Sequence, residues 1–342
     1  YNTGITFSLS KSYNEEIDSW TNIKLVNSIS LDGNYGDLSA LKVFNNNIYF
    51  FQKSAVGLVN FNDRVQINTS DGVPIEISNS GKVQGKTYIS NFYGCSNKWS
   101  MVNTASGIYF IDDINKSILH FNGQSFIDLS ATKQVYSWIN KNISHFSWNL
   151  ANDSVRVLYD KNTSDIYFTN NKEALAFNEQ LGVFSSFYSY PNVEWLFTLG
   201  ENSYQVCKGN IWKLHSGNQY SNFFNKKENY SISIIANPEF QSDKLFDTIE
   251  FRTNGIEHFT NWKADSYPFN SLVTTNEYQT AISTTSSLKK KFRTWRWQIG
   301  RSNTFSNKFK RDRIRNPWAK ITMSGNSENE VRLYDIVVTY YT

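Results

Sequence analysis

The sequence is poor in the residues on which several classes of protein depend. Its 342 residues include 2 cysteines, 5 prolines and 4 histidines. The cysteines, Cys95 and Cys207, cannot supply a disulfide framework or a four-cysteine zinc site. The histidines are scattered and show no H-x-x-x-H spacing. We therefore expect no metal site and no cofactor.

Long apolar runs are also absent. The mean hydropathy is −0.49, and no stretch approaches about 18 consecutive apolar residues, so a membrane-spanning helix is excluded. Charged residues make up 19% of the chain and aromatic residues 16%, whereas disordered chains have many charges and few aromatics. A chain of 342 residues can bury a large core and is long enough for about two domains.

Sequence motifs of the common enzyme classes are missing as well. The chain has no G-x-S-x-G, no phosphate-binding glycine loop and no H-E-x-x-H. A cysteine nucleophile needs a histidine close to it in space, and no sequence feature indicates one for Cys95, so we expect a buried structural thiol instead. Asp112 and Asp113 fall in the loop of an expected hairpin, where acidic turn residues are common. We therefore predict that the protein is not an enzyme.

What the sequence does contain is a period of two. Alternating β-type runs predict an all-β chain with small helical insertions. One short helix is expected over 131–142, because Val135, Trp138 and Ile139 then share one face. A weaker helical pattern covers 15–25. Strands are predicted at 41–51, 107–112, 117–122, 154–159, 165–169 and 211–214.

A repeat runs through the first part of the chain. Its template is a small residue, Ile-Tyr-Phe, a polar loop, an aliphatic residue and Phe-Asn, which describes a β-hairpin with Ile and Phe on one face and Tyr on the other. The copies are Asn47–Asn62, Gly107–Asn122, Asp165–Asn178 and a degenerate fourth, Asn210–Gly217. Sheets repeated every 40 to 60 residues, roughly, are typical of propeller blades. A β-sandwich with accidental hairpin similarity is the alternative.

The residue pattern of the sequence changes near Asn225, where a polar junction is followed by longer strand-like runs without the repeat. We predict a β-propeller-like repeat domain over residues 1–224 and an antiparallel β-sandwich domain over 225–342. Strands of the second domain are expected at 230–236, 245–253, 278–283, 292–299, 318–323 and 331–341.

The segment from Lys289 to Arg315 is strongly basic, with 11 Lys or Arg residues against one acid, Asp312. It carries about +10, and because the whole chain carries +4, the remainder is acidic by about six charges. One interpretation is contact with nucleic acid. The favoured interpretation is contact with acidic residues of a neighbouring subunit. The interface candidates are Arg293, Arg296, Lys310, Arg311 and Arg313.

Several motifs occur together in this chain. Residues 41–122 contain L-K-V-F-N-N-N-I-Y-F-F-Q-K-S-A-V-G, D-G-V-P-I-E, G-C-S-N-K-W-S and G-I-Y-F-I-D-D, while D-R-I-R-N-P-W and L-Y-D-I-V-V begin at Asp312 and Leu333. In this combination the chain resembles the tail stabilisation or muzzle proteins of crAss-like short-tailed bacteriophages. The resemblance covers most of the chain from about Leu41 onward, and none of its motifs is catalytic.

The resemblance implies a virion component at the end of the tail tube that forms a cyclic homo-oligomer around the tail axis and contacts other tail proteins. Such proteins are much longer than 342 residues, so we expect this chain, which begins at Tyr1, to be a C-terminal fragment of one. No functional residues can be carried over.

Two classes of function follow. The leading hypothesis is a structural virion protein that stabilises or closes a short tail. The alternative is a carbohydrate-binding or carbohydrate-cleaving receptor module on a propeller scaffold. A deep pocket with two carboxylates about 5 to 9.5 Å apart would favour cleavage. A flat polar and aromatic surface buried by sister chains would favour the structural protein.

Overall fold

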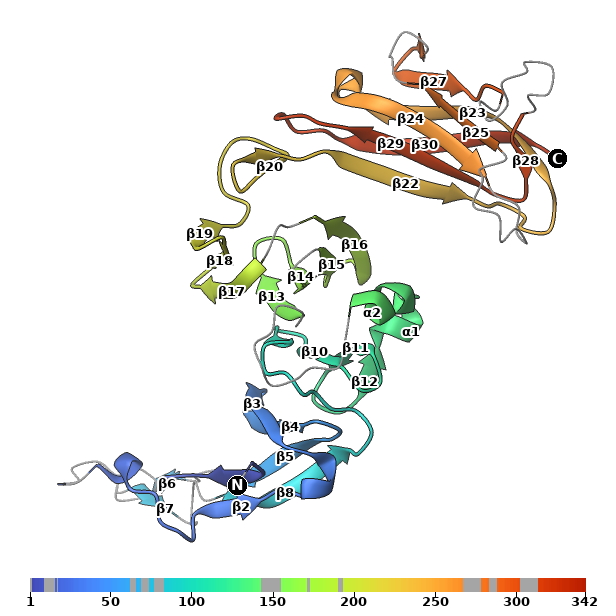
Figure 1. Cartoon of the computed structure of the whole chain (residues 1–342). Helices are drawn as coiled ribbons and strands as arrows, with labels where there is room; N and C mark the ends of the chain where they lie inside the picture. Colours follow the sequence, from blue (N-terminus) through green and yellow to red (C-terminus); the bar gives the residue numbers. More distant parts are fainter. Residues whose placement is uncertain are drawn as a thin grey trace. The chain divides into compact units, whose positions relative to one another are not determined.

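The chain folds into two compact units, Tyr1–His215 and Ser216–Thr342 (Figure 1). The computed structural model describes residues 2–8, 16, 18–61, 66–68, 74–76, 83–142, 155–170, 173–189, 193–266, 278–282, 288–301 and 313–342, with the backbone alone for 66–68, 74–76 and 278–282. Antiparallel sheets dominate both units, so the all-β prediction is confirmed. Within the described ranges, no helix has the length and apolar character needed to span a membrane.

The first unit contains four successive antiparallel sheets, each built from consecutive or nearly consecutive strands. None of these sheets closes on itself in the part of the chain that is described. The first sheet has the order β3 (Leu38–Phe44), β4 (Asn47–Gln52), β5 (Val56–Phe61), β8 (Val83–Ser90). The second has β9 (Met101–Asn103), β10 (Ile108–Asp112), β11 (Ser117–Phe121), β12 (Phe126–Asp128). The third has β13 (Arg156–Asp160), β14 (Asp165–Thr169), β15 (Ala174–Asn178), β16 (Val183–Tyr188), and the fourth has β17 (Val193–Leu199), β18 (Asn202–Cys207), β19 (Asn210–Lys213).

The repeated tyrosines occupy equivalent positions in three of these sheets. Tyr49, Tyr109 and Tyr167 lie in β4, β10 and β14, and each of these strands is second in its own sheet. The three tyrosines therefore lie in separate sheets. The blade interpretation requires this separation.

The two faces of each Ile-Tyr-Phe strand pack against different neighbours. Ile108 and Phe110 join the core shared with the first sheet, whereas Tyr109 joins the core shared with the third. Ile166 and Phe168 likewise belong to the core shared with the second sheet. Since successive side chains of a strand point to opposite faces, one tripeptide serves two interfaces.

The tyrosine of one repeat meets the Phe-Asn of the next. The Tyr49 ring packs edge-on against Phe121 with ring centroids 5.0 Å apart, and the Tyr109 ring lies 5.9 Å from that of Phe177. Asn122 and Asn178 cap the turns that follow them, since Asn122 Oδ1 accepts from the Ser125 amide at 2.8 Å and Asn178 Oδ1 accepts from the Leu181 amide at 2.9 Å. Packing between sheets and turn capping therefore explain why these residue types recur.

The fourth sheet is out of step with the predicted fourth copy. Asn210–Gly217 supplies β19, which is third in its sheet, and the second position is held by β18. The residue at the place of the repeated tyrosine is therefore Tyr204, and not Trp212 of the predicted fourth copy. In β18 the buried positions of Ile and Phe are taken by Ser203 and Gln205.

Short elements complete the first unit. The helix expected over 131–142 is two helices, α1 (Leu129–Thr132) and α2 (Tyr136–Asn142), with Trp138 and Ile139 buried as predicted. The chain breaks between them at Gln134, whose φ is 57°. The weaker pattern at 15–25 yields one 3-10 turn in its described part, η1 (Ser19–Thr21). The remaining elements are η2 (Gly33–Tyr35) and the pairs β1 (Gly4–Thr6) with β2 (Ser28–Ser30) and β6 (Gln66–Asn68) with β7 (Pro74–Glu76).

The second unit has two larger sheets that contribute to one apolar core. The first has the order β22 (Tyr230–Ala236), β29 (Ala319–Gly325), β24 (Phe259–Ser266), β25 (Tyr278–Ile282). In the second, β23 (Lys244–Thr253) pairs with β27 (Thr294–Gln298), β28 (Arg315–Asn316) and β30 (Leu333–Tyr341), and β26 (Lys289–Lys291) pairs with β27. Trp262 of β24 and Trp297 of β27 are the largest buried side chains of this core. The unit also contains η3 (Ile256–His258) and the pair β20 (Asn222–Phe223) with β21 (Lys226–Lys227).

Candidate functional site

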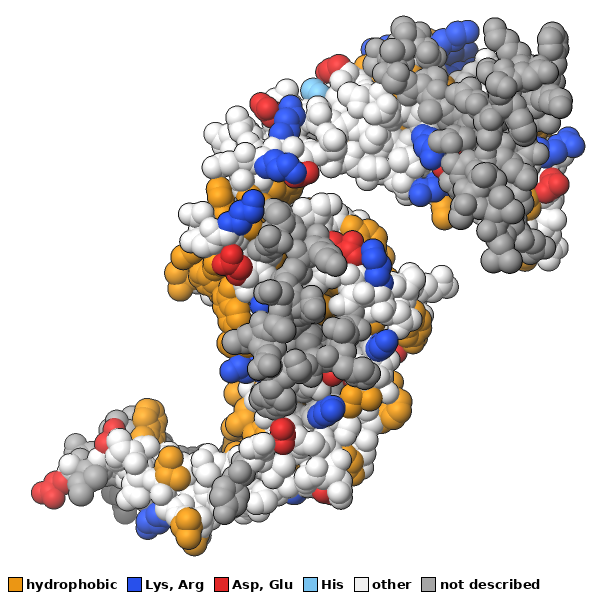
Figure 2. Space-filling model, in the orientation of Figure 1, with side chains coloured by type: hydrophobic (Ala, Val, Ile, Leu, Met, Phe, Trp, Pro, Cys, Tyr) orange, Lys and Arg blue, Asp and Glu red, His pale blue; other side chains and the backbone are white. Residues whose placement is uncertain are grey.

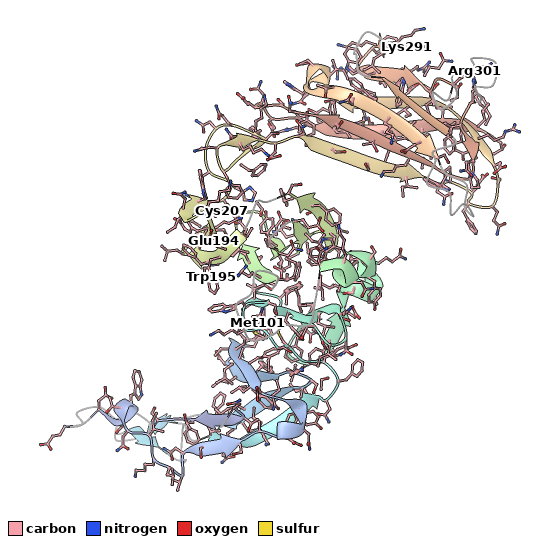
Figure 3. All side chains as sticks on the ribbon, viewed as in Figure 1. Met101, Glu194, Trp195, Cys207, Lys291 and Arg301 are labelled. Atoms are coloured by element: carbon pink, nitrogen blue, oxygen red, sulfur yellow. The ribbon has the colours of Figure 1, made fainter. Side chains whose placement is uncertain are left out.

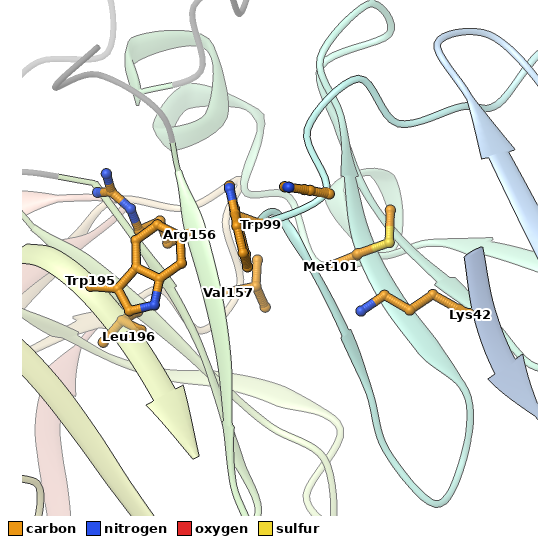
Figure 4. A pocket seen from close by; sticks show the side chains of 8 residues that line it. Lys42, Trp99, Met101, Arg156, Val157, Trp195 and Leu196 are labelled. Carbon is orange, nitrogen blue, oxygen red and sulfur yellow. The ribbon is translucent and has the colours of Figure 1, made fainter. Parts of the chain in front are cut away.

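The first strands of the four sheets in the Tyr1–His215 unit line one pocket (Figure 4). It encloses about 210 Å³. The lining comes from β3, β9, β13 and β17, together with the loop before β9. These residues are Lys42, Lys98, Trp99, Met101, Arg156, Val157, Trp195 and Leu196. The pocket therefore lies where four sheets present the same strand position.

Two tryptophans and two cations form a continuous chain of contacts on the pocket wall. The Lys98 ammonium lies 4.7 Å from the centre of the Trp99 ring. The Trp99 and Trp195 rings meet edge to face with centroids 4.3 Å apart, and the Arg156 guanidinium lies 5.7 Å from the Trp195 ring. Both cation–ring distances fall within the range of favourable cation–π attraction. The aromatic rings thus hold the two cations in place.

Backbone features set this geometry. The amide of Val157 donates to the carbonyl of Trp99 at 3.0 Å and so ties β13 to the loop before β9. In β17 the register against β18 shifts between Val193 and Trp195. Such a bulge re-aims the side chains that follow it. Figure 4 shows the Trp195 ring beside Arg156, on the same wall as Trp99.

The pocket is cationic. Its eight lining residues include Lys42, Lys98 and Arg156 and no carboxylate. Arg156 is 8% exposed, and its Nη1 donates to the carbonyl of Val193 at 3.0 Å. Its Nε is buried with no hydrogen-bond partner in the described part of the chain. Burial lowers the pKa of Arg156 and of Lys42, because removal from water disfavours the charged forms. The paired carboxylates of a glycosidase are absent from this lining.

The described parts of the basic segment lie on the second sheet of the Ser216–Thr342 unit. Arg296 is in β27 opposite Glu250 of β23, with which it forms an ion pair. Arg313 precedes β28 and pairs with Asp247 at 3.1 Å. Arg293 is exposed in the turn between β26 and β27. The other two candidates, Lys310 and Arg311, lie outside the described residues. Trp297 is buried and Arg296 is exposed, so successive residues of this strand face the core and the solvent.

The turn between β26 and β27 has an unusual tip. Phe292 is 89% exposed and has a φ of 56°. A bulky residue in the left-handed region carries backbone strain, which Gly or Asn would relieve. The three lysines of β26 are exposed on one side of Phe292 and Arg293 follows it. Figure 3 labels Lys291 at this end of the unit, and Figure 2 shows Lys and Arg side chains on its surface.

The polar residues considered for catalysis have structural roles. Asp112 is buried, and its carboxylate accepts four hydrogen bonds, from the backbone amides of Gly94, Ile114 and Asn115 and from Asn115 Nδ2. Burial raises its pKa, and these bonds oppose the rise. Asp113 accepts from the Ser96 amide at 3.3 Å. The two acids therefore join the turn after β10 to the loop at 94–96.

Both cysteines are buried in the first unit, and they are not joined in a disulfide. Desolvation raises the pKa of Cys95 to about 12. It also raises the pKa of Cys207. The expectation that Cys95 is a buried structural thiol is confirmed. In the described ranges, no three His, Cys, Asp or Glu side chains are grouped so that they could share a metal ion.

We expect neither thiol to react with a disulfide reagent in the folded protein at pH 8. With a pKa of about 12, about one Cys95 side chain in 10,000 is a thiolate at that pH. The measurement is thiol release with and without guanidinium. Two thiols should react in denaturant and none in buffer, whereas prompt labelling of Cys95 in buffer would contradict its burial.

Comparison with known proteins matches both parts of the chain. Residues 1–209 match the family model described as Crassvirus muzzle protein, and residues 218–302 match the model described as Crassvirus muzzle protein C-terminal domain. The muzzle protein of Bacteroides phage crAss001 is 39% identical over 351 aligned residues, which cover 98% of this chain and 25% of that protein. The chain therefore spans about a quarter of the length of this curated relative.

Proposed function

This chain belongs to the Crassvirus muzzle protein family, and from that premise we propose that it is a structural, non-enzymatic part of a phage virion. We place it in the tail, where it stabilises or closes the tail end and contacts other tail proteins. The described fold supports this proposal, because the acids and thiols considered for catalysis are buried in structural roles. The assignment to the virion rests on the similarity to the muzzle protein of phage crAss001.

The architecture suits a scaffold. We propose that the first unit is propeller-like, because its sheets pack in succession and their first strands line one pocket. For the second unit we propose an antiparallel β-sandwich, since its two sheets share one core. The division between two domains then lies between His215, where the first compact unit ends, and Asn225, where the residue pattern of the sequence changes.

The observation that best supports a contact role is the tip of the β26–β27 turn. An exposed aromatic residue held in a strained conformation among cations is typical of an interface anchor, since Phe and Arg are enriched where partners bury surface. Arg296 and Arg313 already have carboxylate partners within the chain, whereas Arg293 stands exposed beside Phe292. We propose that Arg293, Arg296, Lys310, Arg311 and Arg313 lie at or near an interface with an acidic protein surface.

A cyclic homo-oligomer supplies such a surface. The basic segment carries about +10 and the rest of the chain about −6. A ring of identical subunits is closed by heterologous contacts, in which one patch of each subunit meets a different patch of its neighbour, so one basic face can meet one acidic face around the whole ring.

Substitutions in the basic segment should weaken virion assembly. We expect Phe292→Ser with Arg293→Glu, and separately Arg311→Glu with Arg313→Glu, to reduce incorporation of the protein into particles by tenfold or more, roughly the loss of one buried anchor. Incorporation of the unaltered protein should itself fall at higher salt, because screening weakens its charge contacts, so the difference between it and the variants should narrow. The measurement is the amount of the protein in purified particles from cells that supply the variant gene.

Lys133→Glu is the matched control, since it reverses an exposed lysine in the other unit. It should leave incorporation unchanged. Normal assembly with failed genome packaging or ejection would instead support contact of the basic segment with nucleic acid. Normal assembly and normal infection in both variants would overturn the interface proposal.

A further inference from the structure

The pocket of the first unit has no role in the proposed virion contact, and its chemistry is specific enough to indicate a ligand. Its volume of about 210 Å³ is below the roughly 300–1,000 Å³ of pockets for drug-sized molecules. It suits one ring or one side chain. The wall offers three cations, two indole rings and the aliphatic surface of Met101, Val157 and Leu196.

The charge of the occupant follows from the cations. Lys42 is half-buried and Arg156 almost fully buried, and no acid among the lining residues balances them. Burying a charge without a counter-charge costs free energy, which a bound anion would offset. The buried Nε of Arg156 has no acceptor among the described residues, so the guanidinium retains unused donor capacity. A guanidinium and an ammonium together match a carboxylate or a phosphate, and the carboxylate, as the smaller group, leaves more of the 210 Å³ for the rest of the ligand.

The shape of the occupant follows from the aromatic rings. An aspartate or glutamate side chain carries one or two methylene groups, which would leave most of both indoles uncovered. A sugar acid carries its carboxylate on a six-membered ring whose C–H faces are apolar. Trp99 and Trp195 present an edge-to-face pair, and 39% of Trp99 remains exposed. Aromatic faces gain most from flat apolar partners.

From these two properties we propose that the pocket formed by Lys42, Trp99, Arg156 and Trp195 binds one acidic sugar residue, with its carboxylate at the cations and its ring against the indoles. Trp195 is a specificity residue for the ring, and Lys42 for the charge. Binding is reversible and involves no covalent step. The proposal is independent of the virion role, because the chain would present this pocket whether or not the basic segment contacts a partner.

The test uses calorimetric titration of the whole 342-residue chain with D-glucuronic acid, D-glucose and N-acetylglutamic acid. We expect glucuronic acid to bind at least tenfold more tightly than the other two. Lys42→Gln should weaken it about tenfold, the loss of one charge-assisted hydrogen bond. Trp195→Leu should weaken it by a similar factor, and Lys133→Gln, an exposed lysine far along the sequence from the lining, should leave it unchanged.

Each outcome of the titration either supports or overturns the proposal. Equal binding of glucose would show that the cations are not used, and tighter binding of N-acetylglutamic acid would identify a protein carboxylate as the ligand. Either result overturns the proposal, as does the absence of heat at millimolar glucuronic acid. Thermal melting of each variant checks the fold. If Trp195→Leu melts early, Lys42→Gln still tests the site, because Lys42 is half-buried and its replacement by Gln removes no apolar side chain from the described clusters.

Discussion

Replacing Lys244 with methionine should destabilise the Ser216–Thr342 unit by about 3 kcal/mol. The Lys244 side chain is fully buried, and its ammonium donates to three backbone carbonyls, those of Glu239 and Pro317 at 2.7 Å and that of Ser242 at 2.9 Å. Methionine has a similar length but donates nothing, so three buried acceptors lose their partner. Urea unfolding gives the free energy, and hydrogen exchange of β23 and β29 locates the loss.

The control is Lys289→Met in the exposed strand β26. A surface substitution of this kind should change the free energy of unfolding by less than about 0.5 kcal/mol. Equal urea midpoints for the Lys244 variant and the unaltered protein would mean that the ammonium does not join the loop at 239–242 to the start of β29.

Phe110→Ala should have the largest effect in the Tyr1–His215 unit, a loss of about 3–5 kcal/mol. The Phe110 ring is fully buried between the first two sheets, with the Phe51 ring 5.2 Å away and the Phe126 ring 6.3 Å away. Total stabilities of about 5–15 kcal/mol leave little margin for such a loss. Chemical denaturation measures it, and hydrogen exchange should rise in β4 and β10 together because the cavity is shared.

Phe187→Ala provides the comparison, because Phe187 is 63% exposed in β16. It should change the stability by less than about 0.5 kcal/mol. If both phenylalanine variants unfolded at the same denaturant concentration, the packing of successive sheets would not be what stabilises this unit.

The repeat was predictable because its residue pattern matches the way its side chains pack. Ile108, Tyr109 and Phe110 alternate between two cores, and a period of two can be read directly from the sequence. Strand β24 was not predicted, because F-T-N-W-K-A-D-S carries polar and charged residues that are uncommon in strands. Only pairing on both edges, with β25 and β29, makes it a central strand.

In the fourth repeat, local sequence similarity does not identify the equivalent strand. N-I-W at Asn210 resembles N-I-Y at Asn47, yet the equivalent strand is β18, whose buried positions hold Ser203 and Gln205. Polar side chains at core positions remove the apolar alternation on which sequence analysis depends.

The pocket could not be predicted at all. Lys42 and Trp195 are separated by 153 positions, and the lining comes from four strands and a loop. The basic segment was visible as a charge excess, but the pairing of Arg296 with Glu250 depends on the register between β27 and β23. Composition reveals the amount of charge, whereas the fold decides which charges remain for a partner.

In each Ile-Tyr-Phe strand, Ile and Phe pack toward one neighbouring sheet and Tyr toward the other, so the series of sheets has a direction. The first and second sheets each contribute a tyrosine to the core that they share with the next sheet, which contributes its isoleucine and phenylalanine. The junction between the third and fourth sheets differs, because Ser203 and Gln205 hold these positions in β18. A copy of the second sheet inserted between the second and third would therefore meet matching surfaces on both sides. Tyr49, Tyr109 and Tyr167 follow one another at intervals of 60 and 58 residues. Evolution can therefore lengthen or shorten this part of the chain in steps of one whole sheet, without redesigning those two junctions.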